Sequence, residues 1–342
     1  MSEKRVTSQD VANLAGVSRT TVSLVLNDVK GSNIPQKTRE KVHSAAEELG
    51  YVPNATAQAL ATRRAKAIGL VMTRSPHHIA SDTFLPQIIG GLLGVIREYK
   101  LRLLVESVDA EHQDHEYLEL VRAKHIDGMI LLTPRLDDSG LTKLAEGNVP
   151  TVLMGNLLGS GFYSVDVDNR AAACKAVQHL LDLGHRKIAC ISSAPASYSA
   201  SLERVLGYTD AMQAAGIAPD ESLIRYADFD PQSGFESMNS LLKTRRDLSA
   251  VFVASDNVAM GAISALHAAG LRVPDDISVI GFDDIPWARY SDPPLTTIRL
   301  PAQELARVAC ITLIDLIRNV APVERKLLLD TELIERQSCR KL

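Results

Sequence analysis

The chain has 342 residues, of which 46% are hydrophobic and 23% charged, enough for two or three domains with hydrophobic cores. Residues 1–66 contain ten Lys and Arg against six Asp and Glu, a net charge of +4. Because the whole chain carries −4, the remaining residues carry −8. A small basic segment on a large acidic body indicates that only the first part of the chain meets a polyanion.

Several classes of protein and site find no support in the sequence. The four cysteines are scattered without a CxxC motif, so we expect neither a disulfide framework nor a metal site. The segment HQDHE (112–116) is interpreted as solvated polar surface. No P-loop, GxSxG, HExxH or GxGxxG motif indicates an enzyme or a cofactor. Without a signal peptide or a membrane-spanning stretch, we expect a cytoplasmic protein with no membrane partner.

Residues 7–27 (TSQDVANLAGVSRTTVSLVLN) predict two short helices joined by a turn. Thr7 or Ser8 can cap the first helix, Gly16 supplies the turn, and Ser18 caps the second helix. Apolar residues recur at helical spacing on the facing sides of the two helices: Val11, Ala12, Ala15, Val22, Val25 and Leu26.

The second helix presents a polar side that suits DNA. The packing leaves Arg19, Thr20 and Ser23 exposed, and short hydroxyls and arginine can recognise base edges in a major groove. A third helix over residues 37–49 completes a small helical head, and the polar, alanine-rich residues 51–66 form a connector.

From Ala67 onward, short β-branched runs alternate with helix-length segments, which predicts parallel, doubly wound sheets. The predicted strands are 67–72, 102–107, 128–133, 151–155, 163–167, 187–192, 250–254 and 277–282. About 275 residues is large for one such sheet, so two similar halves fit better. The expected fold class is α/β: an all-α helix-turn-helix head joined by a hinge to a two-subdomain, doubly wound core.

Several segments together resemble the LacI/GalR (lactose repressor/galactose repressor) family. In the head and hinge they are DVANLAGVSRTTVSLVLN (10–27), TREKV (38–42) and LGYVPNATAQAL (49–60). In the body they are GHRKIA (184–189), ERVLGY (203–208), SDNVAMGA (255–262), VPDDISVIGFDD (273–284) and PPLTTIRLP (293–301). The body segments resemble the core shared with periplasmic sugar-binding proteins.

The resemblance implies a DNA-binding head at 1–50, a hinge at 51–66 and an effector-binding, dimerising core at 67–342. The expected N-subdomain comprises about 67–164 plus 292–321, and the C-subdomain comprises about 165–291 plus 322–340. The residues expected to contact DNA are Thr7, Ser18, Arg19, Thr20, Thr21, Ser23 and Asn27 in the head and Asn54, Ala57 and Leu60 in the hinge.

The hinge and the residue at position 24 both affect how the operator is expected to be recognised. In the family, the segment matching 54–62 folds into a helix only on operator DNA, and Leu60 matches the leucine that wedges between central base pairs. Nine residues are too few to hold a helix in water, so DNA and the partner subunit must drive the ordering. Leu24 stands where members often have Arg, so an operator sequence cannot be transferred from a relative.

Ligands of doubly wound sheets bind at the carboxyl ends of the strands. The residues expected to bind an effector there are Ser75, Phe84, Asn156, Arg204, Phe229, Asp256 and Trp287. Carboxylate, guanidinium, carboxamide and aromatic groups together suit a sugar. The resemblance supports Arg204, Asp256, Asn156 and Phe229, whereas the other three rest on position alone. Asp283 and Asp284 are expected to fix a turn and not to bind ligand.

These features predict a homodimeric repressor of carbohydrate-utilisation genes that binds a pseudo-palindromic operator and responds to a sugar or oligosaccharide. No leucine heptads follow the last predicted helix, so a dimer is expected. Two alternatives stay open: the same family regulated by a nucleobase or a partner-protein corepressor, and a sugar-binding or enzymatic core with a protein-interaction head. The sequence leaves open the effector, the operator and whether the ligand induces or corepresses.

Overall fold

A computed structural model describes residues 6–27, 31–52, 64–108, 113–157 and 159–342 of the chain. The predicted hinge residues Asn54, Ala57 and Leu60 lie outside the described residues. Within them, no helix is long and apolar enough to cross a membrane.

The head consists of α1 (Ser8–Ala15), α2 (Arg19–Leu26) and α3 (Gln36–Glu48). Thr7 caps α1 in a reciprocal capping box with Asp10, since the Thr7 N–H donates to the Asp10 carboxylate at 2.8 Å. Gly16 ends α1 in the left-handed conformation (φ 65°), where a residue without a Cβ is favoured. Ser18 accepts a hydrogen bond from the Thr21 N–H at 3.0 Å and begins α2. The three helices enclose a small core of Val11, Ala12, Val22, Val25, Val42, Ala45 and Ala46.

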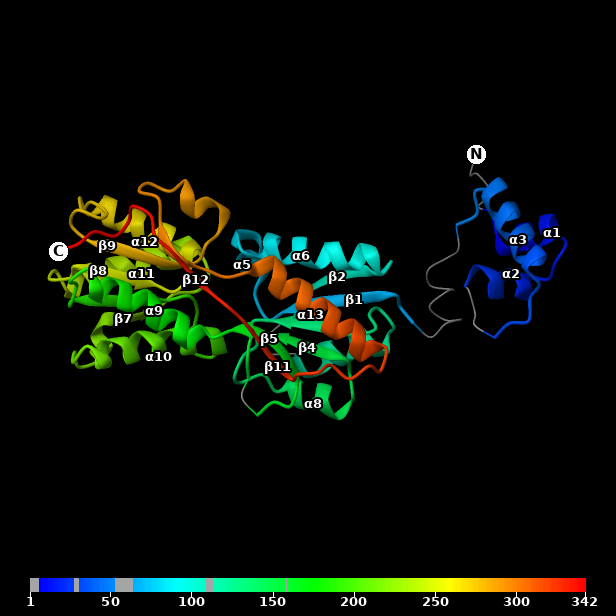
Figure 1. Ribbon diagram of the computed structural model, residues 1–342, viewed down its shortest axis with the longest axis horizontal. Coiled ribbons are helices and arrows are strands. Elements are labelled where there is room, and N and C mark those ends of the chain that lie inside the picture. Colours follow the sequence, from blue (N-terminus) through cyan, green and yellow to red (C-terminus); the bar gives the residue numbers. More distant parts are fainter. Residues whose placement is uncertain (1–5, 28–30, 53–63, 109–112, 158) are drawn as a thin grey trace.

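The body contains two sheets of six strands, arranged side by side along the long axis of Figure 1. The first sheet, of the N-subdomain, is parallel throughout and has the order β11 (Lys326–Leu329), β5 (Tyr163–Val167), β4 (Thr151–Met154), β3 (Met129–Leu132), β1 (Ala67–Met72) and β2 (Arg102–Ser107). The second sheet, of the C-subdomain, has the order β12 (Glu332–Ile334), β10 (Thr296–Arg299), β9 (Ser278–Asp283), β8 (Ala250–Val253), β6 (Ile188–Ser192) and β7 (Ile224–Tyr226). Only β12 runs antiparallel, along β10.

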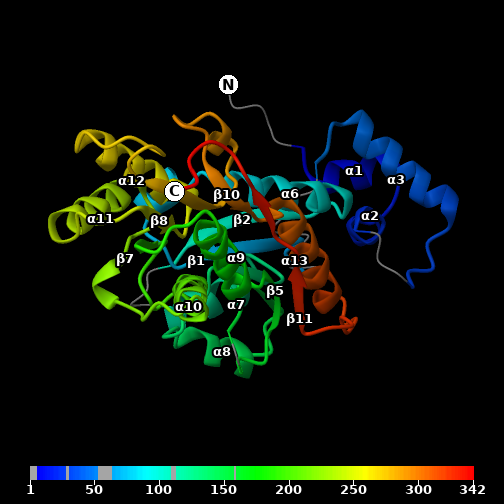
Figure 2. The same cartoon turned by 60° about the vertical axis from the view of Figure 1, so that its left-hand side comes forward.

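Helices cover both faces of each sheet, as buried parallel strands require. On the first sheet, α6 (Leu85–Glu98) packs beside α13 (Ala302–Ile317), as Figure 2 shows, and α7 (Gln113–Arg122) packs beside α8 (Gly140–Glu146). On the second sheet, α9 (Asn169–Asp182) pairs with α10 (Ser199–Ala214), and α11 (Pro231–Thr244) pairs with α12 (Asp256–Ala268). Short helices complete the chain: α5 (Pro76–Ser81), η1 (Glu221–Leu223) and η2 (Pro286–Arg289).

All eight predicted strands form, but the chain divides between the sheets differently from the subdomain bounds expected from the sequence. All of β5 lies in the first sheet, β10 pairs with β9 in the second, and β11 returns to pair with β5 in the first. The chain therefore crosses between subdomains after β5, after β10 and after β11. Strands as short as β10 and β11, with four residues each, carry no sequence pattern that indicates the sheet to which they belong. Hydrogen-bond pairing with a neighbouring strand alone decides the sheet.

Candidate functional site

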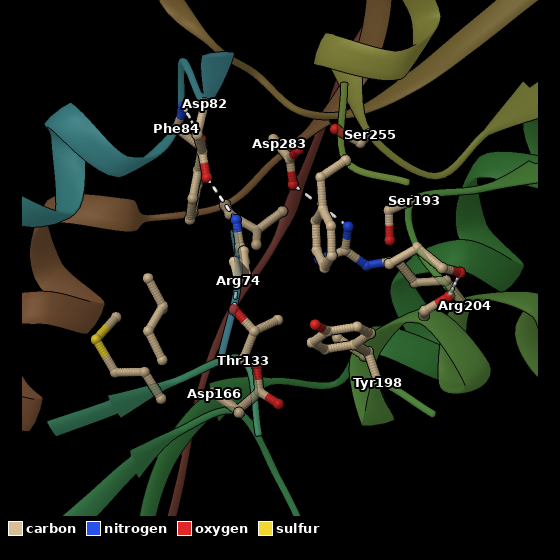
Figure 3. Close-up of a pocket in the computed structure, with 18 of the residues that line it drawn as sticks. Arg74, Asp82, Phe84, Thr133, Asp166, Ser193, Tyr198, Arg204, Ser255 and Asp283 are labelled. Carbon is tan, nitrogen blue, oxygen red and sulfur yellow. Dashed lines mark hydrogen bonds and ion pairs between the residues drawn. The ribbon is translucent and has the colours of Figure 1, made fainter. Parts of the chain in front are cut away.

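A cavity lies between the two subdomains, at the carboxyl ends of strands from both sheets (Figure 3). Its volume is about 100 Å³, below the roughly 300–1,000 Å³ typical of ligand pockets. The lining residues from the first subdomain and its helices are Arg74, Asp82, Phe84, Leu132, Thr133, Met154, Gly155, Val165, Asp166, Leu300 and Leu305. The second subdomain contributes Ser193, Ala194, Tyr198, Ala200, Ser201, Arg204, Phe229, Ser255, Asn257 and Asp283.

Arg74 lies two residues after the end of β1 and is buried in the cavity wall. Its Nη1 donates to Asp82 Oδ2 at 2.6 Å, and its Nη2 donates to the hydroxyl of Thr133. Its guanidinium carbon lies 4.2 Å from the centroid of the Phe229 ring, on the opposite subdomain. A cation over an aromatic face in a desolvated cleft is stabilising, so this contact favours closure.

Arg204 is the buried cation of the second subdomain. Its Nε donates to Asn169 Oδ1 at 2.9 Å, and its Nη1 donates to the Ala254 carbonyl at 2.7 Å and lies 3.4 Å from Asp283 Oδ1. Its guanidinium carbon lies 3.9 Å from the centroid of the Phe282 ring. The ends of β8 and β9 on one side and the start of α9 on the other therefore hold the guanidinium that α10 carries.

The carboxylates near Arg204 differ in their exposure to solvent: Asp283 is buried, whereas Asp166 is partly exposed. Burial raises the pKa of Asp283 to about 6, and the positive charge of Arg204 opposes this rise. Burial also raises the pKa of Asp166 to about 6, although hydrogen bonds from the Val167 N–H and the Asn169 amide stabilise its charge. The cavity therefore holds carboxylates that change charge close to neutral pH.

Direct contacts join the two subdomains around the cavity. The Tyr198 hydroxyl donates to the Thr73 carbonyl at 2.8 Å, and the Asn257 amide donates to the Ser81 carbonyl at 3.1 Å. At the cleft mouth, the histidines that begin α5 face the loop before α11. The pairs are His77 with Asp230 at 3.4 Å and His78 with Asp228 at 3.3 Å.

The structure brings three of the seven predicted effector residues into this cavity: Phe84, Arg204 and Phe229. Four lie outside it. Ser75 begins α5, where its hydroxyl accepts from the His78 N–H. Asn156 borders an adjoining hollow that shares Asp166 and Ala200 with the cavity, and Trp287 lies on η2 with 62% of its surface exposed.

Asp256 differs most from its predicted role, because its carboxylate is fully buried inside the C-subdomain. It accepts from the Thr297 hydroxyl at 2.6 Å and from the Ile285 N–H at 3.0 Å, and it packs against Gly281. These bonds fasten α12 to β10 and to the loop after β9. Burial and the neighbouring Asp283 raise its pKa well above the usual range. Asp256 is thus a structural anchor behind the cavity wall.

The sequence assigned Asp283 and Asp284 the same turn-fixing role, and the structure separates them. Asp283, expected to fix a turn, lines the cavity, whereas Asp284 fixes the turn by accepting from Arg299 at 2.8 Å and Arg336 at 2.6 Å. Sequence reasoning also missed Arg74 and Tyr198. Arg74 had a signal, since it follows β1 by two residues. Tyr198 had none, because its loop reaches the cavity only through the tertiary fold.

The head displays the predicted polar side of α2. Thr7, Ser18, Arg19, Thr20 and Ser23 are exposed, and Thr21 and Asn27 are partly exposed. Arg19 Nε donates to the Ser8 hydroxyl at 3.0 Å, which ties the start of α2 to α1, and the Asn27 amide donates to the Ser23 hydroxyl at 3.2 Å. Leu24 is half-buried and offers the groove only apolar surface. This arrangement suits insertion of α2 into a major groove.

Comparison with known proteins agrees with both parts of the architecture. Residues 7–54 match the family described as bacterial regulatory proteins, lacI family, and residues 177–339 match the periplasmic binding protein-like domain. The HTH-type transcriptional regulator CelR of Thermobifida fusca is 37% identical over 339 residues, which cover 98% of this chain and 98% of CelR.

Two solved structures extend the comparison. A transcriptional regulator CelR–cellobiose complex has a TM-score of 0.76 at 35% identity, covering 98% of this chain and 100% of that one. A lac repressor dimer bound to operator and the anti-inducer ONPF has a TM-score of 0.85 at 32% identity, with the same coverage.

A helix-turn-helix head on a periplasmic-binding-protein-like core defines a DNA-binding transcriptional regulator. With relatives of this identity along nearly its whole length, the chain belongs to the LacI family. These relatives are regulators and not enzymes, as the sequence predicts for this chain.

Proposed function

We propose that this protein is a repressor of carbohydrate-utilisation genes whose affinity for its operator is set by a sugar or oligosaccharide in the cleft between the subdomains. The observation that carries the proposal is the composition of the cavity: two guanidinium groups, three carboxylates and aromatic rings meet at the ends of strands from both sheets. The hydroxyl groups of a sugar can pair with these charged groups, and the C–H groups of its ring can pack on the aromatic faces. A transcriptional regulator solved in complex with a sugar, the CelR–cellobiose complex, is a structural relative of this chain.

The proposed mechanism couples the cleft to the DNA through the relative orientation of the subdomains. The effector contacts both subdomains and favours one orientation, since Arg74 and Phe84 lie on one side and Arg204 and Phe229 on the other. In a homodimer, that orientation sets the spacing of the two hinges and hence the cost of folding them on DNA. A coupling free energy of about 1–3 kcal/mol changes operator affinity about 5–150-fold.

The proposed DNA contacts are those predicted for the head and hinge, with the protein placed in the cytoplasm beside its operator. Thr20 and Ser23 contact base edges, Arg19 contacts bases or phosphates, and Leu60 enters the minor groove. The matched control for Thr20→Ala is Glu48→Ala, an exposed residue on α3.

The test begins with fluorescence anisotropy on the DNA upstream of the protein's own gene and on random duplex. Binding to random duplex should weaken steeply with salt, because phosphate contacts release counterions. Thr20→Ala and Leu60→Ala should each lower operator affinity about tenfold or more while Glu48→Ala changes it little. A flat salt response, or equal operator affinity for all three variants, would contradict the DNA-binding assignments.

A thermal-shift panel then tests the effector. Cellobiose, maltose, glucose and galactose are compared with adenine and guanine, and the compound that raises the melting temperature is added to the operator assay. We expect a sugar to raise the melting temperature and to change operator affinity. If only a purine raises the melting temperature, or if none of the sugars raises it, the sugar assignment is contradicted.

A further inference from the structure

The ion pair of Arg74 and Asp82 in the cavity wall bears on the charge of the sugars that the cavity can bind. Arg74 is 9% exposed, and two of its three nitrogens are engaged, by Asp82 and by Thr133. Its third nitrogen, Nε, is buried without a hydrogen-bond partner among the described residues. A buried unsatisfied donor costs about 1–3 kcal/mol, so an acceptor oxygen placed beside this Nε–H would be stabilising.

The charges that line the cavity leave no cation free. Arg74 is paired with Asp82, and Arg204 is balanced by Asp283 and, through Asn169, by Asp166. Two cations against three carboxylates give the described lining a surplus of negative charge. A ligand carboxylate or phosphate would enter a desolvated space opposite groups of the same sign, which is unfavourable. A hydroxyl group suits the same surroundings, since it donates to a carboxylate and accepts from a guanidinium.

We propose that the cavity selects uncharged polyol effectors over their anionic counterparts, such as uronic acids and sugar phosphates, and that Asp82 sets this selectivity by neutralising Arg74. This inference rests on the proposed function and narrows its effector class. Arg74 Nε and the Asp82 carboxylate together form one donor and one acceptor for neighbouring hydroxyls. Without the charge of Asp82, Arg74 becomes a free cation that can pair with an acidic sugar.

Asp82 allows this to be tested with an isosteric change. Its Oδ1 accepts from the backbone N–H groups of Phe84 at 2.7 Å and Leu85 at 2.9 Å, so it caps α6 while its Oδ2 holds Arg74. In Asp82→Asn, the side-chain oxygen keeps the cap and the charge is lost. Asp168→Asn is the matched control, since Asp168 caps α9 by accepting from the Ala171 N–H and lies outside the cavity.

The experiment is isothermal titration of the full-length protein with matched pairs: glucose with glucuronate, galactose with galacturonate, and glucose with glucose 6-phosphate. For wild type we expect the neutral member of the best-binding pair to bind at least about tenfold more tightly than its acid. Asp82→Asn should shift this ratio toward the acid by about tenfold or more, whereas Asp168→Asn should leave it unchanged.

A second variant tests the opposite direction. Arg74→Gln leaves the carboxylates unbalanced, so the preference for the neutral sugar should rise while its absolute affinity falls. Equal wild-type affinity for the acid and neutral sugars would overturn the inference. Equal neutral-to-acid affinity ratios in Asp82→Asn and Asp168→Asn would also overturn it. So would an Arg74→Gln variant that binds the acid more tightly than wild type does. Wild type that binds sugar acids but no neutral sugar overturns the selectivity alone. Wild type that binds neither overturns the proposed function and this inference together.

Discussion

Arg74 and Phe229 come from different subdomains, and the Arg74 guanidinium carbon lies over the Phe229 ring, 4.2 Å from its centroid. The backbone of Phe229 has φ at 66°, in the left-handed region that residues other than glycine rarely adopt. The Tyr198 ring lies perpendicular to the same ring, with 4.8 Å between centroids. The ring is therefore a fixed platform on which closure of the cleft and contact with an effector both depend.

Removing this platform should weaken effector binding. Phe229→Leu keeps an apolar side chain but loses the aromatic face, and a cation–π contact contributes about 0.5–2 kcal/mol. We therefore expect cellobiose or the best sugar of the panel to bind about 2–30-fold more weakly by isothermal titration. The control is Phe235→Leu on α11, outside the cavity, which should leave sugar affinity unchanged. Equal losses in both variants would show that Phe229 acts only through packing.

Effector binding should weaken in mild acid. The pKa of Asp283 is raised to about 6, so its carboxylate takes up a proton as the pH falls through that value and becomes a neutral, weaker acceptor for ligand hydroxyls. Isothermal titration near pH 7.5 and near pH 5 should show lower affinity at the lower pH. Asp283→Asn should lose part of this dependence, with Asp166 supplying the rest. Equal wild-type affinity at the two pH values would contradict the prediction.

The same raised pKa acts on folding in the opposite sense. The folded state binds the Asp283 proton more tightly than the unfolded chain does, so protonation favours folding. The contribution of this group to the free energy of unfolding is therefore largest below about pH 4 and falls as the pH rises to about 6. Urea unfolding of wild type and Asp283→Asn between about pH 4 and 6 measures how the free energy of unfolding of each depends on pH. Identical pH dependence in the two proteins would show that the pKa of Asp283 is ordinary.

Asp256 should matter for stability and not for direct contact with effector. Asp256→Ala leaves the Ile285 N–H and the Thr297 hydroxyl buried without their acceptor. We expect the free energy of unfolding to fall by about 3 kcal/mol in urea titrations, and by less in Asp256→Asn, which retains an acceptor. The folded variant should keep its sugar affinity within about threefold. Unchanged stability with lost sugar binding would instead support the role that the sequence suggests.

The contact between α11 and α12 should not tolerate a larger residue at Gly261. A Cβ there would overlap the Pro231 carbonyl oxygen and the backbone of Phe235. Gly261→Ala should therefore lower the free energy of unfolding by about 1–3 kcal/mol or more in spite of alanine's better helix propensity. Ser264→Ala, exposed on the same helix, is the control and should change it by less than about 0.5 kcal/mol. Equal stability of the two variants would contradict the close approach.

The sequence by itself determined the features that depend on local pattern. The caps at Thr7 and Ser18 and the turn at Gly16 lie where short-range chemistry places them, because a side chain reaches its own backbone within three residues. Strand and helix periodicity likewise identified eight of the strands and the helices between them, since β-branched runs and apolar residues at helical spacing are local patterns.

Only the tertiary structure decided which of the strand-end residues face the cavity. Arg74 lies in its wall while the next residue, Ser75, caps α5, and Asp283 lines it while Asp284 fixes the turn. A shift of one residue reverses the direction of a side chain, and that direction depends on packing from distant segments. The subdomain crossings at β10 and β11 were decided in the same way, because hydrogen-bond pairing between strands far apart in sequence has no local signal.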